Sequence, residues 1–223
     1  MLEIDHLFIF VATPKKGETP NEALLLQDAG FRESYRRDHP GQGTTNICYC
    51  FDNAYLELLW VNDTAHIKSP LIKDTKLSER SQWRETGTSP FGIALRPEIP
   101  FETWDYRPPY LPSGMSIPVA KTSLDPRQPF IFTSPGGQRP DRWNDPKPLQ
   151  KEAPIGCHTI SSISVNVPEN CPSNPDLTTL KEQGLVELNL GRSTHKMTLS
   201  LADENGRATH YINLPSCRVT KAL

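Results

Sequence analysis

Hydrophobic and polar positions alternate along residues 2–62 with a period of about two in some segments and a helical period in another. The helical segment begins with Thr19, a capping residue followed by Glu22, and ends at Gly30, which suits a left-handed terminal residue. The pattern therefore predicts a β-α-β-β-β unit, with strands at 2–12, 31–37, 44–51 and 54–61 and a helix at 19–30.

The same order of elements returns near the C-terminus. Residues 158–189 can be laid on residues 4–35 without a gap, and Ser173 with Asp176 repeats the helix-start signal. Two further strands around the turn at Asn205 and Gly206 then complete a second unit. We expect one domain overall, with a first unit at 1–62, an irregular middle segment at 63–156 and a second unit at 157–223.

The middle segment is rich in proline and less regular. It contains three expected strands, at 90–97, 116–123 and 129–135, which can extend the sheet of either unit. The loop 136–148 is expected to be a plain linker, with a surface excursion or a lid as the alternative. Residues 75–87 are expected to form a short helix. Between residues 97 and 154, where proline is concentrated, long turns and extended segments should replace helices, because proline interrupts helices.

Charge and cysteine content exclude several classes of protein. The chain has 24 basic and 26 acidic residues, for a net charge of -2, and no run of Lys or Arg that would follow a phosphate backbone, so no nucleic-acid partner is expected. No apolar stretch approaches the roughly 18 residues of a membrane span. Five cysteines without C-x-x-C spacing suggest reduced thiols. We expect a cytoplasmic protein with no membrane association.

A carboxylate lies in the middle of the apolar segment 54–61. Glu57 would cost several kcal/mol if it were buried and ionised without a partner. In the first strand, His6 shares a face with Phe8 and Phe10, and Asp5 should lie on the opposite face. If the first and fourth strands are close, His6 and Glu57 converge, which would begin a divalent metal site. Alternatively, they form hydrogen bonds with each other and with a bound ligand, or they are polar core residues whose hydrogen bonds are made within the protein.

These residues and the repeated unit resemble a known family. The strands DHLFIFV and YLELLWV and the β-α-β-β-β units are similar to the vicinal oxygen chelate superfamily, the glyoxalase, bleomycin-resistance and dioxygenase group. The segment 39–61 resembles its glyoxalase-like domain proteins. The resemblance implies an α+β fold whose paired units form a partly open, barrel-like mixed sheet around a ligand cavity.

The resemblance also implies a metal site. In the family, a first-strand His and a fourth-strand Glu bind a divalent metal with residues of another unit, and His6 and Glu57 match those two positions. The metal would be Zn, Ni, Co, Mn or Fe. In the second unit, however, the counterpart of His6 is Ile160, and the strand 90–97 would offer Pro90 or Phe91 instead, none of which can ligate.

Other residues must then complete the coordination. His210 is the third ligand that we select, and His158, His39 or water are the alternatives. His39 and Asn46 are candidate ligand-binding residues near a Gly-rich loop, which can equally be a simple turn.

Two further residues are candidates for ligand binding. Tyr55 shares the face of Glu57, and Arg96 lies at the end of a strand and suits an anion. Alternatively, Tyr55 only packs against its neighbours, and Arg96 is an exposed residue at the end of its strand without a binding role.

Two function classes follow. In the first, a metal at His6 and Glu57 polarises an oxygen of a small oxygenated metabolite and Glu57 acts as the base, which is lyase or isomerase chemistry. In the second, the cavity binds and sequesters a small molecule without turnover, as resistance proteins of the family do. Homodimers are frequent in the family, although two units in one chain can complete the barrel alone.

Overall fold

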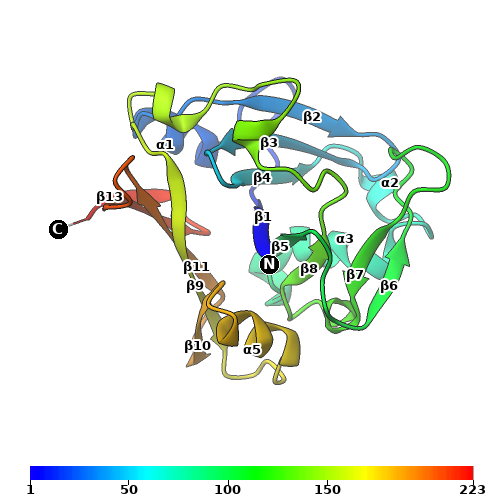
Figure 1. Ribbon diagram of the computed structural model, residues 1–223. Coiled ribbons are helices and arrows are strands. Elements are labelled where there is room, and N and C mark those ends of the chain that lie inside the picture. Colours follow the sequence, from blue (N-terminus) through cyan, green and yellow to red (C-terminus); the bar gives the residue numbers. More distant parts are fainter. Residues whose placement is uncertain (223) are drawn as a thin grey trace.

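The computed structural model describes residues 1–222 and has an α+β fold of two mixed sheets (Figure 1). The larger sheet has eight strands in the order β2-β3-β4-β1-β5-β8-β7-β6, and the smaller has five in the order β10-β9-β11-β12-β13. The larger sheet curves around a cavity without closing, so the predicted class and the partly open, barrel-like arrangement are confirmed. No helix of these residues is long and apolar enough to cross a lipid bilayer.

The elements have the following bounds. The strands are β1 Glu3–Phe10, β2 Tyr35–His39, β3 Thr44–Cys50, β4 Tyr55–Val61, β5 Phe91–Arg96, β6 Thr103–Tyr106, β7 Ile117–Ala120, β8 Phe130–Thr133, β9 Thr159–Pro168, β10 Glu187–Arg192, β11 Lys196–Ala202, β12 Ala208–Leu214 and β13 Arg218–Lys221. The helices are α1 Asn21–Asp28, α2 Thr64–Ile67, α3 Leu77–Ser81, α4 Trp83–Thr86 and α5 Pro175–Glu182.

Both longer helices form where the sequence predicts them, but their caps differ from the prediction. Among the described residues no side chain caps α1, whose N-terminal flank is Pro20, so the expected cap from Thr19 is wrong. In α5 the cap is Asn174 in place of Ser173, and its Oδ1 accepts hydrogen bonds from the backbone N–H groups of Asp176 and Leu177 at 2.9 and 3.1 Å. Asn174 directly precedes the proline that begins the helix, which is the position that a capping side chain needs.

The middle segment extends the sheet of the first unit. β5 pairs antiparallel with β1, and β8 runs parallel to β5 as β4 runs parallel to β1. Counted outward from the β1–β5 pair, the order is β1-β4-β3-β2 on one side and β5-β8-β7-β6 on the other, so the two halves have the same arrangement. Strands β5 to β8 therefore supply the second half of the curved sheet. This second half has no helix between β5 and β6.

The C-terminal segment contains the expected order of strand, helix and further strands, but it pairs them differently. β9 lies between β10 and β11 in the smaller sheet, whereas β1 lies between β4 and β5. The first unit is therefore paired with the middle segment and not with the C-terminal one. The division of the chain at residues 62 and 156 stays a prediction.

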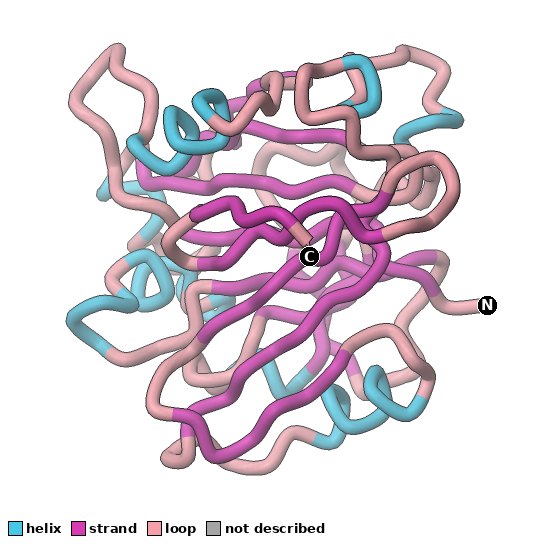
Figure 2. The backbone as a smooth tube through the Cα atoms, turned by 90° about the vertical axis from the view of Figure 1, so that its left-hand side faces the viewer, coloured by secondary structure: helices cyan, strands magenta, loops and turns pink. Residues whose placement is uncertain are grey.

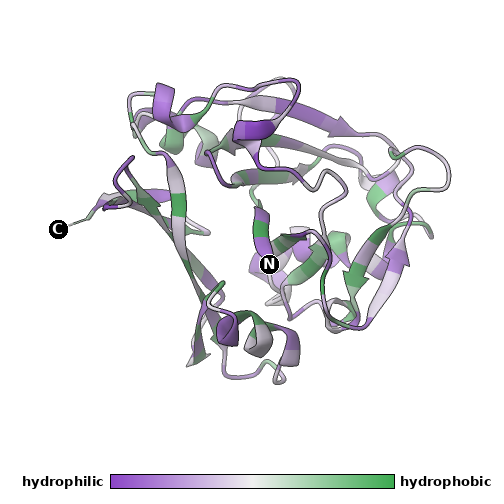
Figure 3. Cartoon of the chain, viewed as in Figure 1, coloured by the Kyte–Doolittle hydropathy of each residue, from purple (hydrophilic) through white to green (hydrophobic). Residues whose placement is uncertain are grey.

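The main core lies between the two sheets. Figure 2, seen from the side of the smaller sheet, shows its strands lying over the larger sheet. Hydrophobic residues gather on the strands and polar residues on the loops (Figure 3). The contacting side chains are fully buried, and they include Leu7, Ile9, Ile47, Leu56, Leu58, Ile93, Ile163, Val165, Met197, Leu199, Leu201 and Ile212. One face of the larger sheet is thus used for folding, which leaves the concave face for the cavity.

The Gly-rich loop after β2 is shaped by close packing. Gly43 has a φ of +82°, and a Cβ there would lie 2.3 Å from the carbonyl oxygen of Asp63 and 2.7 Å from the backbone nitrogen of Ile67. Both contacts are with backbone atoms at α2, which cannot move as a side chain can. Glycine is therefore required at position 43 by its conformation and by the approach of α2.

We expect Gly43→Ala to lower the free energy of unfolding by about 2 to 4 kcal/mol, because a left-handed alanine is strained and its methyl group overlaps the backbone of α2. Gly17→Ala is the matched control, since Gly17 also has a positive φ, of +84°, but nothing lies within 4 Å of its Cβ position. The control should lose only about 1 kcal/mol. Urea unfolding measures both losses, and equal losses would contradict the packing explanation.

Candidate functional site

The concave face of the larger sheet encloses a cavity of about 510 Å³. Strand register places one residue from each of six adjacent strands in a row across this face, and the row runs Tyr35, Cys48, Glu57, Phe8, Gly92, Phe130. Polar side chains come from the β2, β3 and β4 side, and apolar ones from the β5 and β8 side. The cavity therefore has one polar wall and one apolar wall.

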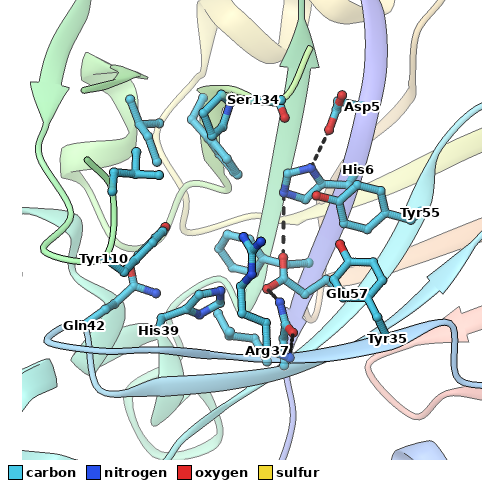
Figure 4. Close-up of a pocket in the computed structure, with 18 of the residues that line it drawn as sticks. Asp5, His6, Tyr35, Arg37, His39, Gln42, Tyr55, Glu57, Tyr110 and Ser134 are labelled. Carbon is cyan, nitrogen blue, oxygen red and sulfur yellow. Dashed lines mark hydrogen bonds and ion pairs between the residues drawn. The ribbon is translucent and has the colours of Figure 1, made fainter. Parts of the chain in front are cut away.

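Three residues of β1 and β4 form the polar centre of the cavity (Figure 4). His6 Nδ1 lies 2.8 Å from Asp5 Oδ1, and because an ionised carboxylate only accepts, Nδ1–H is the donor. His6 Nε2 lies 3.7 Å from Glu57 Oε2. That separation is too long for a direct hydrogen bond, so both atoms can contact a ligand atom that lies beside them in the cavity.

Asp5 reaches the cavity because β1 is irregular. The register with β5 shifts between Ile4 and His6, so the alternation that would turn Asp5 to the opposite face is interrupted, and Asp5 lines the cavity beside His6. Burial alone would raise the pKa of Asp5, but its hydrogen bonds with His6, Ser134 and Arg96 outweigh burial and hold that pKa below its usual value. Asp5 therefore stays ionised and fixes the orientation of the imidazole.

Glu57 is held by a neighbouring amide. Asn46 Nδ2 donates to Glu57 Oε1 at 2.7 Å, and Glu57 is only 7% exposed. The Tyr55 ring stacks on the His6 ring at a centroid distance of 4.4 Å and an angle of 14°. The cavity therefore brings together five of the residues selected from the sequence, which are His6, His39, Asn46, Tyr55 and Glu57.

Arg96 does not reach this cavity. It is 5% exposed and its guanidinium donates to Asp5 Oδ2 at 3.1 Å, to Glu3 Oε2 at 2.9 Å and to the carbonyl oxygen of Asn53 at 2.7 Å. The antiparallel register of β5 with β1 places Arg96 opposite Glu3. The Arg96 guanidinium is already paired with these two carboxylates, so it orients the Asp5 side chain from outside the cavity.

His210 lies in a different part of the fold. It belongs to β12 of the smaller sheet, where its Nδ1 is 3.7 Å from Cys157 Sγ, and it does not line the cavity. His158 also lies outside the cavity and pairs with Asp52 at 3.3 Å. Because the C-terminal segment forms its own sheet, neither histidine is brought to His6 and Glu57, and the metal set selected from the sequence is not assembled.

The sequence of the first half of the chain matches a known family. Residues 4–103, which span β1 to β5, match the family model described as a glyoxalase-like domain. The chain carries a glyoxalase-like domain. This domain belongs to the vicinal oxygen chelate superfamily, whose members bind small molecules and often use divalent metals. No curated protein matches the sequence.

The fold of the chain also occurs in a solved structure. A crystal structure of a hypothetical protein from Staphylococcus aureus is similar over 98% of this chain and 97% of its own, with a TM-score of 0.53. The two sequences are 11% identical, so the similarity concerns the fold alone.

The donor set of the glyoxalase-like domain does not fit a resident divalent metal. The positions of β5 and β8 in the registers that contain His6 and Glu57 are Gly92, Ala94, Phe130 and Phe132, and none of these side chains is a ligand. Within residues 1–222, no group of three or more His, Cys, Asp or Glu side chains is arranged to hold a metal ion. His6 and Glu57 supply two donors, whereas catalytic zinc sites usually have three from the protein.

Several cavity residues were missed from the sequence. Arg37 lies between Tyr35 and His39 on β2, and strand alternation from His39 would have found it. Tyr110 lies in a Pro-rich loop without a periodic pattern, and Trp143 lies in the loop that was expected to be a linker. Trp143 makes edge contacts with Tyr35 and Tyr55 at 6.0 and 5.7 Å, so this loop covers one side of the cavity.

Proposed function

We propose that the cavity binds a small oxygenated metabolite and that Glu57, with His6, transfers a proton to or from one of its carbon atoms, as a lyase or an isomerase does. The observation that supports this most is the pair of atoms Glu57 Oε2 and His6 Nε2, which lie 3.7 Å apart and open to a cavity of about 510 Å³. A cavity of that volume suits a small ligand.

Each residue of the polar centre has a role in this proposal. Glu57 Oε2 takes the proton from a carbon next to a carbonyl group, and the Asn46 amide holds the carboxylate through Oε1. His6 Nε2, which carries a lone pair because the ring proton is on Nδ1, faces the same point, so it can accept this proton from Glu57 Oε2 and return it to the neighbouring atom. Asp5 fixes the His6 ring through Nδ1. No step in this sequence passes through a metal ion.

Sequestering without turnover is the second candidate function. The part of the cavity wall that Phe130 and Phe132 of β8 form is apolar, so it contributes shape and hydrophobic contact but no acid or base. This composition suits a binding protein as well as an enzyme.

The two candidates differ in a direct assay. Protein dialysed against a chelator should increase the exchange of carbon-bound hydrogen for deuterium in a hydroxy or oxo compound by at least about 100-fold over buffer, followed by NMR. Quenching of Trp143, which lines the cavity, reports binding of the same compounds. Binding without exchange would favour sequestering, and exchange that appears only after a divalent ion is added would contradict the metal-free proposal.

A further inference from the structure

The cavity contains a positive charge without an ion-pair partner. Arg36 and Lys147 also line it, but they are paired with Glu33 and Asp145. Arg37 points into the cavity (Figure 4). Within residues 1–222, no carboxylate lies within ion-pair distance of its guanidinium. An Arg in this position, facing a cavity, is available to an anion of the ligand.

His39 supplies a second donor beside this charge. It is 8% exposed, and its Nδ1 lies 2.9 Å from Thr44 Oγ1. The Gln42 amide donates to the same oxygen at 2.7 Å, and within residues 1–222 Thr44 Oγ1 has no other acceptor for its proton, so we assign that proton to His39 Nδ1. Gln42 is itself oriented by the Tyr106 hydroxyl, which donates to its Oε1 at 2.8 Å. The remaining ring proton of neutral His39 is then on Nε2.

The Nε2 atom of His39 has no hydrogen-bond partner among the described residues and is not among the atoms sealed from solvent, and the His39 side chain lines the cavity. Burial lowers the pKa of His39, which keeps the ring neutral near pH 7. A neutral imidazole with its proton on Nε2 is a hydrogen-bond donor directed at a ligand.

Tyr110 completes this part of the cavity wall. Its ring lies 4.8 Å from the His39 ring, and within residues 1–222 its hydroxyl has no hydrogen-bond partner. Burial raises the pKa of Tyr110, so the hydroxyl keeps its proton and can donate. Arg37, His39 and Tyr110 therefore present donors with one net positive charge.

The opposite wall has an apolar surface at its centre. Phe8, Phe130 and Phe132 pack together there, with centroid distances of 5.4 to 6.2 Å, and Leu111 and Ile117 line the same side. Hydrocarbon is the part of a ligand that gains most from burial against such a surface.

We propose that the ligand is a small carboxylic acid with a hydrocarbon group, whose carboxylate binds Arg37, His39 and Tyr110 and whose hydrocarbon part packs against Phe8, Phe130 and Phe132. This inference rests on the proposed function, since it names the class of molecule that the same cavity takes. A monoanion is favoured over a phosphate because Arg37 is one charge and Glu57 lies in the same cavity.

Two probes of equal shape test the assignment. We expect 3-phenylpropanoate to bind at least about tenfold more tightly than 3-phenylpropanamide, by calorimetry or Trp143 fluorescence, because a charge-assisted pair is stronger than a neutral one. Arg37→Met should weaken the acid by at least about tenfold and change the amide by less than about twofold. Arg32→Met is the matched control and should change neither, because Arg32 pairs with Glu152 outside the cavity.

Several results would overturn the inference. Equal affinity for acid and amide in the wild type would do so, and so would binding of neither probe or an acid preference that survives in Arg37→Met. Inorganic phosphate that displaces the acid with equal affinity would overturn the choice of carboxylate. In Glu57→Gln the acid preference should remain. A wild type that prefers the acid but shows no hydrogen exchange would contradict the proton-transfer proposal alone, whereas exchange without acid preference would contradict the anion site alone.

Discussion

Glu57→Gln is expected to slow hydrogen exchange by about 10² to 10⁴-fold while ligand affinity changes by no more than a few fold, because the amide has the shape of the carboxylate but is not a base. The amide oxygen can still accept from Asn46 Nδ2, which lies 2.7 Å from Glu57 Oε1 in the wild type. The side chain therefore stays in place, and the change removes the proton acceptor alone. The measurement is the exchange rate by NMR under saturating ligand.

Two further variants make the result interpretable. Glu152→Gln removes a carboxylate that pairs with Arg32 outside the cavity, and its exchange rate should equal that of the wild type. His6→Asn should lose exchange with ligand binding retained, since it removes Nε2. An unchanged rate in Glu57→Gln would refute the assignment of the base, and a hundredfold loss of affinity would instead make Glu57 a binding group.

Arg80→Met is expected to lower the free energy of unfolding by about 3 kcal/mol or more, because it leaves buried carbonyl groups without a donor. Arg80, on α3, is fully buried, and burial lowers its pKa to about 9. It has no carboxylate within ion-pair distance among the described residues. Its guanidinium instead donates to the backbone carbonyl oxygens of Thr75, Ser89, Ser123, Asp125, Pro126 and Gln128.

These acceptors lie in segments that are distant in sequence, so Arg80 joins the helical region after β4 to the loop before β8. Arg84→Met is the matched control, since Arg84 is partly exposed, pairs with Glu22 and lies over the Trp83 ring. Its loss should be within about 1 kcal/mol. Urea unfolding of both variants provides the comparison, and equal losses would show that the carbonyl contacts do not stabilise the fold.

Local patterns in the sequence were sufficient for the elements of the first unit. β1, β3, β4 and α1 lie within a few residues of their predicted bounds, because alternation and helical periodicity reflect which side chains are buried. The convergence of His6 and Glu57 was also predictable, since both lie on the cavity face of neighbouring parallel strands. The caps of the helices were not: in α5 the neighbouring polar residue Asn174 takes the place of Ser173, and α1 begins after Pro20 without a side-chain cap among the described residues.

The sequence by itself determined the strands, the helices and the pair His6 and Glu57, because these depend on contacts between near neighbours in the chain or on a regular period. Tertiary structure decided which segment pairs with the first unit, since strand pairing joins residues far apart and both partners offered apolar faces. It also turned Asp5 to the cavity through the irregularity in β1 and kept His210 away in a second sheet. Whether Arg37 has a partner depends on side chains from distant strands and loops, so only their packing leaves its charge free for a ligand.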